Sequence, residues 1–204
     1  MAGAAVTSDG AQILERSVDG ALQAWTGLVE RLRDEDLVTE VRAAGMTIID
    51  ALARGNKLIV LGNGGSAAMA NHIAAEFSGK CIQDREPLPA ISLADSSTAI
   101  TAIGNDYGFD QVFTRGLRAL GAVGDVVIAM STSGSSRNVL QALDTARELG
   151  LTTIMLTGAA APENLEADHV LRAPVESTPR VQEVHLLWAH SWCEAVDTTW
   201  AVQD

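Results

Sequence analysis

Residues 57–80 read KLIVLGNGGSAAMANHIAAEFSGK, an apolar run followed by a glycine-rich turn and an alanine-rich segment. The apolar run has the bulky, partly β-branched side chains of a buried strand, and the segment 66–79 has the composition of a helix. A strand that leads through a short loop into a helix is the first half of a β-α-β unit. This stretch therefore predicts an α/β fold.

The same alternation continues towards the C-terminus. Short apolar runs predict further strands at 89–94, 125–130, 152–158 and 169–174. Between and after them we expect helices at about 97–103, 109–120, 138–150, 163–167 and 180–200. Continuously apolar strands separated by helices are typical of a parallel sheet that is covered on both faces.

The N-terminal quarter of the chain is predicted to be helical. Apolar residues recur at helical spacing in 21–32 and again in 36–55, where Asp34 or Asp36 can cap the second helix and Gly55 can end it. With no low-complexity linker or internal repeat, residues 1–204 are expected to form a single domain. Its N-terminal helical segment covers about 10–55 and its sheet-containing core about 56–200.

Charge and cysteine content exclude several classes of protein. The formal net charge of -12 argues against binding to nucleic acid or to an anionic membrane surface, although one local site can still attract a small anion. Cys81 and Cys193 are far apart and predict reduced thiols. With no secretory leader pattern at the N-terminus and no run of 18 apolar residues, we expect a cytoplasmic protein.

Two polar loops follow predicted strands and are candidates for a phosphate site. The loop at 62–66, GNGGS, ends in Ser66 at a helix start, where free N–H groups and the helix dipole favour an anion. The loop at 131–136, STSGSS, carries five hydroxyls, more than a helix cap needs. Each loop alone could be an ordinary strand-to-helix turn. Together, at the carboxyl ends of parallel strands, they favour phosphate binding.

Titratable residues occur at helical spacing in two segments. His72 and Glu76 are four residues apart, and Gln182 and His190 are eight apart, so each pair lies roughly on one helix face. These groups could hold a divalent metal or act as an acid–base pair, or they could be packed and solvated helix residues. Spacing alone does not show that the two helices meet.

Three further polar features lie near these motifs. Asn105 and Asp106 are predicted to lie in a turn between helices, where these residue types are common. Lys80 and Arg180 are the basic residues nearest to the motifs and could contact a phosphate or hydroxyl groups.

Several motifs, taken in order, resemble those of the sugar isomerase (SIS) domain family, and most closely its phosphoheptose isomerases. They are GNGGSAAMANHIAAE (62–76), AIGNDYGF (102–109), STSGSSRNVLQA (131–142), TARELG (145–150), LTG (156–158) and RVQEVHLLWAH (180–190). The resemblance runs from about residue 20 to residue 200. It implies a flavodoxin-like five-stranded parallel sheet flanked by helices, and a homotetramer with active sites between subunits.

The resemblance also implies an activity: conversion of D-sedoheptulose 7-phosphate to D-glycero-D-manno-heptose 7-phosphate through an enediol. Glu76 matches the catalytic base and His190 the acid, and one zinc ion per subunit is expected on His72, Glu76, Gln182 and His190. The implied substrate-binding residues are Asn63, Gly64, Ser66, Lys80, Asn105, Asp106, Ser131, Thr132, Ser133, Ser136, Arg180 and Gln182.

Two positions depart from the family pattern. Lys80 stands where an arginine is common, which keeps the charge but loses the planar fork of donors, and Pro179 stands where some members have an aspartate. Neither change removes a group that moves a proton. The implied zinc also stands in tension with the implied base, because a carboxylate that ligates zinc is a poorer base.

Two other functions within the same fold remain alternatives. A non-catalytic SIS protein of the replication-initiator-associating type would share the loops and the first histidine. It resembles the isomerases less at the positions of Glu76 and His190, both of which this chain has. An enzyme or regulator for hexose or amino-sugar phosphates is disfavoured by the motifs GNDYGF and RVQEVH.

Overall fold

The core of the protein is a five-stranded parallel sheet. The computed structural model describes residues 8–201; residues 1–7 and 202–204, assigned above to the same domain, lie outside the described residues. The strands lie in the order β2-β1-β3-β4-β5, which is the flavodoxin-like order with a reversal between β1 and β3. They are β1 (Leu58–Gly62), β2 (Ala90–Ser92), β3 (Val126–Met130), β4 (Thr152–Gly158) and β5 (His169–Ala173). The predicted fold class is confirmed.

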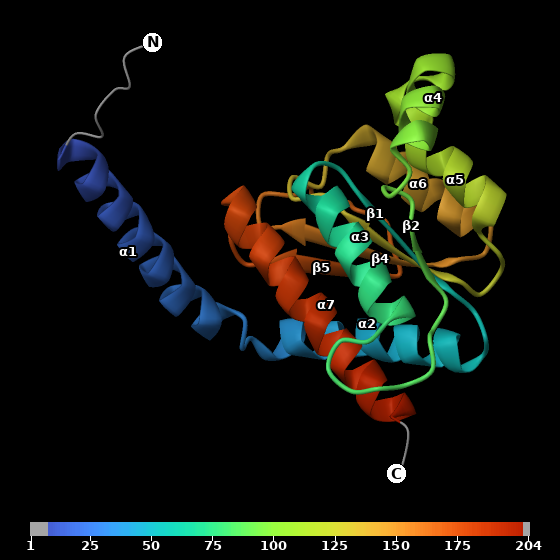
Figure 1. Ribbon diagram of the computed structural model, residues 1–204, viewed down its shortest axis with the longest axis horizontal. Coiled ribbons are helices and arrows are strands. Elements are labelled where there is room, and N and C mark those ends of the chain that lie inside the picture. The colour runs from blue at the N-terminus through green and yellow to red at the C-terminus, as the bar shows by residue number, and fades with distance from the viewer. Residues whose placement is uncertain (1–7, 202–204) are drawn as a thin grey trace.

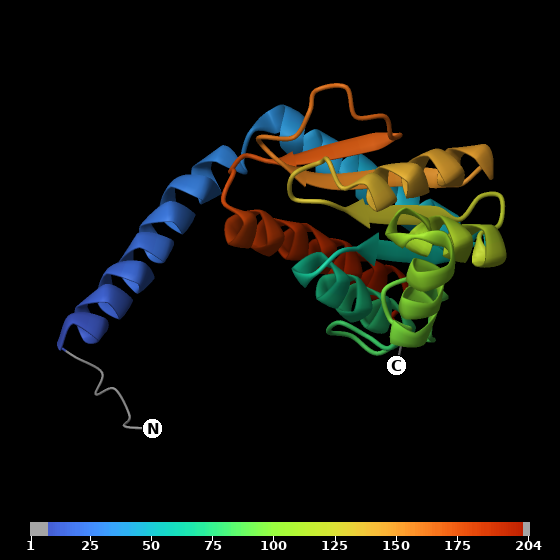
Figure 2. The ribbon, with the colours of Figure 1, turned by 90° about the horizontal axis from the view of Figure 1, so that it is seen from above.

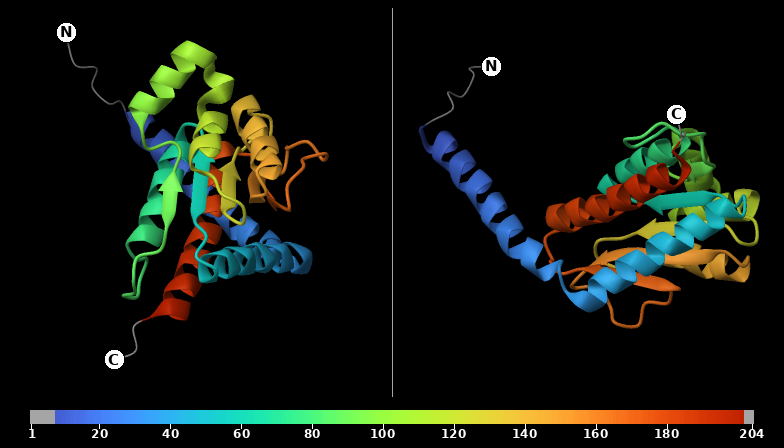
Figure 3. Two further views of the ribbon diagram at one scale, coloured as in Figure 1. Left: turned by 90° about the vertical axis from the view of Figure 1, so that its right-hand side faces the viewer. Right: turned by 90° about the horizontal axis from the view of Figure 1, so that it is seen from below.

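Helices cover both faces of this sheet (Figure 2 and Figure 3). Successive residues of a strand point to opposite faces, so Leu58 and Val60 pack with α2, α3 and α7, whereas Ile59 and Leu61 pack with α5 and α6. The helices are α1 (Ser8–Arg31), α2 (Glu35–Ala53), α3 (Gly65–Ser78), α4 (Ser97–Tyr107), α5 (Val112–Leu120), α6 (Arg137–Glu148) and α7 (Thr178–Trp200), with a 3₁₀ turn η1 (Phe109–Gln111). None of these helices is long and apolar enough to cross a membrane.

The first helix extends away from the body of the molecule (Figure 1). Near its C-terminal end, Leu28 is buried in the core and Trp25 packs against it. The part of α1 before Trp25 instead exposes large apolar side chains at helical spacing: Ile13, Leu14, Val18 and Leu22. Asp34 then caps α2 by accepting a hydrogen bond from the N–H of Leu37, and Gly55, at φ 82°, follows the end of α2, as the sequence predicts.

The sequence predicts a turn between helices at Asn105 and Asp106, but both residues lie in the last helical turn of α4. Gly108, at φ 89°, ends this helix. Gly104 lies within the helix, where little packs against it. The α4 helix buries none of its residues. The side chains of Asn105 and Asp106 are exposed, and Asn105 Nδ2 donates a hydrogen bond to Asp106 Oδ1 at 2.8 Å.

The helix predicted at 163–167 is absent; those residues form a turn and irregular backbone. Arg172 of β5 explains the difference. Its guanidinium donates hydrogen bonds to the carbonyl oxygens of Ala161, Pro162 and Glu163. A helix over 163–167 would use the carbonyl oxygens of Pro162 and Glu163 as its own acceptors. The competing donor therefore holds the segment in a non-helical conformation.

Candidate active site

The two polar loops leave the sheet side by side at the point where the strand order reverses. Gly62, the last residue of β1, is paired in register with Met130, the last residue of β3. A Cβ atom on Gly62 would lie 2.7 Å from the Ser66 Cβ and 3.1 Å from the Met130 carbonyl oxygen. Only glycine at position 62 allows the first loop to approach β3 this closely. In open α/β sheets such a reversal is where ligands bind.

The first loop places Ser66 in the opening turn of α3. Gly64 precedes the helix with φ 56°, a conformation that suits glycine. Ser66 is 3% exposed, and its N–H donates to the Asn63 carbonyl oxygen at 3.0 Å. The loop thus directs the start of a helix, with its partial positive charge, towards the reversal point.

The second loop gathers its hydroxyls at the start of α6. Ser131 donates to Ser136 at 3.0 Å, and the hydroxyls of Ser133 and Ser135 are 2.8 Å apart. Gly134 turns the loop at φ 64°, with its N–H on the Ser131 carbonyl oxygen. These hydroxyls, with those of Thr132 and Ser66, form a set of neutral donors at two neighbouring helix starts. Such a set suits a phosphate.

A pair of asparagines ties the two loops together. The side-chain amide of Asn63 donates to the Asn138 oxygen at 2.9 Å, and the Asn138 amide donates back to the Asn63 oxygen at 2.9 Å. Asn138 is 3% exposed and lies in the first turn of α6. The sequence analysis missed it, because an asparagine near a helix start carries no signal of a partner 75 residues away. Asn63, predicted to touch the sugar, has one edge of its amide occupied by this pair.

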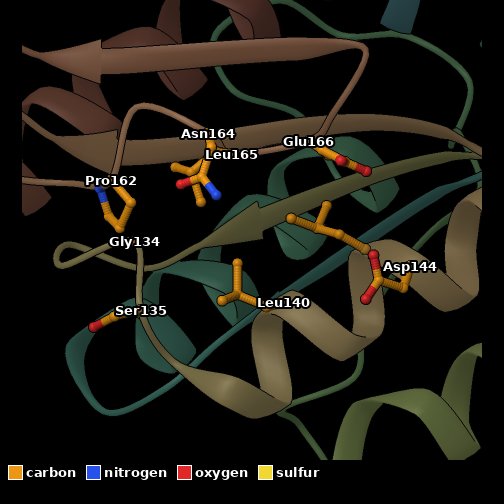
Figure 4. A pocket seen from close by; sticks show the side chains of 9 residues that line it. Gly134, Ser135, Leu140, Asp144, Pro162, Asn164, Leu165 and Glu166 are labelled. Atoms are coloured by element: carbon orange, nitrogen blue, oxygen red, sulfur yellow. The ribbon is translucent and has the colours of Figure 1, made fainter.

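A cavity of about 430 Å³ lies beside the second loop, between α6 and the segment before β5 (Figure 4). Gly134 and Ser135 form one wall, and Leu140 and Leu165 line it. Its charged lining groups are the carboxylates of Asp144 and Glu166, both paired with Arg147. This lining does not suit a phosphate, so we assign the anion site to the hydroxyl cluster and not to this cavity.

Helices α3 and α7 bring together the titratable groups that the sequence left apart. The Nε2 atoms of His72 and His190 are 3.0 Å apart, and His72 Nε2 is 3.7 Å from Glu76 Oε1. One ligand atom from each of the three residues lies within 4.8 Å of the others. The second carboxylate oxygen of Glu76 is buried and has no hydrogen-bond partner in the described part of the chain. The two candidate catalytic residues, Glu76 and His190, thus share one site.

Gln182 and Arg180 lie on α7 near the start of α3. The Gln182 side chain lies against Gly65, so that a Cβ there would be 2.6 Å from its Nε2. Gly65 precedes His72 by seven residues in α3, so the Gln182 side chain lies about two helical turns from His72 along the helix axis. Arg180 pairs with Glu183 at 2.7 Å, and Glu183 also accepts a hydrogen bond from the Trp25 indole of α1.

Other predicted contacts lie further away. Lys80 is just past the end of α3 and 3.8 Å from the Asp84 carboxylate. Fourteen residues separate it from Ser66, about 20 Å along a helix axis. Asn105 and Asp106 lie on the exposed α4 helix. Within one chain, the structure does not bring these three residues to the hydroxyl cluster.

Three other groups near the helix pair are chemically inert. Burial lowers the pKa of His185 to about 4, and the ring contacts the Thr157 carbonyl oxygen at 3.1 Å, so it is a neutral core residue. Burial, with the nearby Glu76 carboxylate, raises the pKa of Cys81 to about 12, and burial also raises the pKa of Cys193. Thiols held in the protonated form are poor nucleophiles.

Comparison with known proteins agrees with this geometry. The model of the SIS domain matches residues 22–158. A phosphoheptose isomerase from Bradyrhizobium sp. (strain BTAi1) is 48% identical over 86% of this chain and 89% of its own length. The chain belongs to the phosphoheptose isomerases of the SIS domain family.

Solved structures of phosphoheptose isomerases have the same fold. The phosphoheptose isomerase GmhA from Neisseria gonorrhoeae is 37% identical, with a TM-score of 0.80 over 91% of this chain and 99% of that chain. The phosphoheptose isomerase from Francisella tularensis is 31% identical, with a TM-score of 0.84 over 90% of this chain and 97% of that chain. The family predicted from the motifs is confirmed.

Proposed function

We propose that this protein is an aldose–ketose isomerase that converts sedoheptulose 7-phosphate to the aldoheptose 7-phosphate. One observation carries the proposal: Glu76 and His190, 114 positions apart in the sequence, share a site formed by α3 and α7, and α3 starts at one of the two loops suited to a phosphate. Membership of the phosphoheptose isomerases supports the choice of a seven-carbon substrate. The same relatives disfavour the replication-initiator-associating protein and the hexose-phosphate enzymes.

The reaction needs two proton transfers in close succession. A ketose becomes an aldose when a proton moves between C1 and C2 and another moves between the two oxygens, through an enediol. Glu76, whose second oxygen has no partner within the described chain, suits the base that removes the carbon-bound proton. His190 is half-buried on α7, with its Nε2 3.0 Å from His72 Nε2, and we assign it the proton transfer at the sugar oxygens.

 

The donor set also fits a divalent metal. Two imidazole nitrogens and a carboxylate oxygen within 4.8 Å of one another are ligands that zinc accepts, and Glu76 Oε1 lies 3.7 Å from His72 Nε2. We propose that His72, Glu76 and His190 hold Zn²⁺; the fourth predicted donor, Gln182, lies against Gly65, two helical turns from the His72 level, and is outside this set within one chain. When bound, the ion would polarise the sugar carbonyl and orient the neighbouring oxygens.

We further propose that the working form is a homotetramer. The apolar side chains along the projecting part of α1, among them Leu14 at 65% and Leu22 at 62% exposure, support burial against other copies. Lys80, Asn105 and Asp106, which lie away from the hydroxyl cluster of their own chain, could then serve the site of a neighbouring subunit. The proposed location is the cytoplasm, which suits the free thiols of Cys81 and Cys193.

The test follows sedoheptulose 7-phosphate by NMR with the purified protein, with zinc supplied and with a chelator. The wild type should form an aldoheptose phosphate, and Glu76→Gln and His190→Gln should each reduce kcat by about 100-fold or more while the far-UV spectrum is unchanged. A wild type that binds the substrate without converting it would instead support the binding-protein alternative.

A further inference from the structure

A buried ion pair lies at the end of α3 that carries Glu76. The side chains of Arg85 and Asp197 are both 0% exposed, and Arg85 Nε is 2.8 Å from Asp197 Oδ1. Arg85 belongs to the loop between α3 and β2, and Asp197 belongs to α7. Figure 1 shows this loop running past the C-terminal half of α7.

Arg85 holds the C-terminal turn of α3. Its terminal nitrogens donate to the carbonyl oxygens of Glu76 at 2.9 Å, Phe77 at 2.9 Å and Gly79 at 3.1 Å. Carbonyl groups in the last turn of a helix lack intrahelical partners, and a cation there also complements the helix dipole. One side chain thus fixes the backbone of the proposed base.

Asp197 holds the loop that follows. Its Oδ2 accepts hydrogen bonds from the successive N–H groups of Cys81 at 2.9 Å, Ile82 at 2.6 Å and Gln83 at 3.0 Å. Burial raises the pKa of Asp197, but these N–H groups and Arg85 outweigh it and hold the pKa below its usual range. Asp197 follows His190 by seven residues, two turns along the same face of α7.

We infer that Arg85 and Asp197 are positioning residues that set the register of α3 against α7, and so the placement of Glu76 and His72 against His190. This inference rests on the proposed function for its catalytic consequence. The pair touches no reacting atom. It connects the backbone of Glu76 to the helix that carries His190 through hydrogen bonds only.

The experiment compares two variants with a matched control. Asp197→Asn removes the charge from the pair, and Arg85→Lys keeps the charge but loses the fork that reaches several carbonyls. The control is Asp125→Asn. Asp125 is also buried, pairs with Lys57 and accepts hydrogen bonds from the N–H groups of Lys57 and Ala122, but it lies before β3 and makes no hydrogen bond to α3 or α7 among the described residues.

All proteins are assayed at a temperature where each is folded by circular dichroism. In Asp197→Asn and Arg85→Lys we expect Zn²⁺ affinity, measured by calorimetry, to fall about tenfold or more. We expect kcat to fall up to about 100-fold with a smaller change in KM, because the phosphate loops are untouched. Asp125→Asn should lose stability while keeping the Zn²⁺ affinity and kcat of the wild type.

A crystal structure of Asp197→Asn separates failure of this inference from failure of the proposed function. If the distance between His72 Nε2 and His190 Nε2 stays within about 0.5 Å of the wild-type value, the positioning role is wrong, whatever the activity. If the distance changes while the wild type shows no isomerase activity, the positioning role stands and the proposed function fails.

Discussion

At the scale of single residues, a substitution at Gly65 tests the role of Gln182 with little effect on packing. A Cβ at this position would meet only the far end of the Gln182 side chain, at 2.6 Å, which can move aside at little cost. We therefore expect Gly65→Ala to keep stability within about 1 kcal/mol of the wild type. Displacing Gln182 should still weaken binding of the sugar phosphate, measured by calorimetry.

The control for this change is Gly27→Ala in α1, where a Cβ meets nothing within 4 Å. Replacing a helical glycine by alanine at an open position should raise the free energy of unfolding by about 0.5–1 kcal/mol and leave ligand binding alone. Unchanged ligand binding in Gly65→Ala would show that the position of the Gln182 side chain against Gly65 has no role in binding.

His185 should make the fold sensitive to acid. Its pKa is about 6.5 when unfolded and about 4 in the folded protein, because burial disfavours the charged ring. The stabilisation from the neutral ring is therefore complete above pH 6.5 and is lost as the pH falls towards 4. This amounts to about 3 kcal/mol.

The measurement is the free energy of unfolding by urea at pH 7 and pH 4. His185→Gln, which can still donate to the Thr157 carbonyl oxygen, should lose much less stability between these pH values than the wild type. Equal losses in the two proteins would rule out His185 as the source.

At the scale of elements, the asparagine pair should set the spacing of the two loops. Asn138→Ala removes both hydrogen bonds to Asn63 and leaves that amide without its partner. An unmet buried polar group costs about 1–3 kcal/mol, so the loops should separate. We expect KM for the sugar phosphate to rise more than kcat falls, measured by steady-state kinetics; a change in kcat alone would contradict this role.

The elements themselves could largely be predicted from the sequence. Strands β1, β3 and β4 are continuous apolar runs, and pattern alone locates them. The predictions failed where a distant partner decides the local structure. Arg172 removes the helix expected at 163–167 by taking its carbonyl groups, and no local pattern reports this.

The site was only half predictable for the same reason. Helical spacing places His72 with Glu76, but His72 and His190 are 118 residues apart, and only the packing of α3 on α7 brings them together. The resemblance to a family supplied the pairing that spacing could not. The residues that hold the site together, Asn138, Arg85 and Asp197, have no distinctive local pattern.

At the scale of the whole molecule, α1 should decide the state of assembly. Leu14 and Leu22 are exposed on one side of this helix. Placing charges there, in Leu14→Glu with Leu22→Glu, should shift the protein from tetramer to smaller species in sedimentation velocity. Gln23→Glu adds a charge at an exposed position about 140° around the helix from the midpoint of the two leucines and should leave the tetramer intact. A wild type that sediments as a monomer would contradict the proposed assembly.

The neutral hydroxyl cluster has a consequence for the speed of substrate capture. The chain carries a net charge of -12, and Arg137, beside the second loop, is already paired with Asp110 at 3.2 Å. An approaching sugar phosphate is therefore repelled by the protein as a whole and attracted only within the short range of dipoles. Added salt screens the long-range repulsion over a Debye length of about 10 Å at 0.1 M. The association rate constant of the sugar phosphate should therefore rise with ionic strength. Enzymes that attract anions with a basic surface show the reverse.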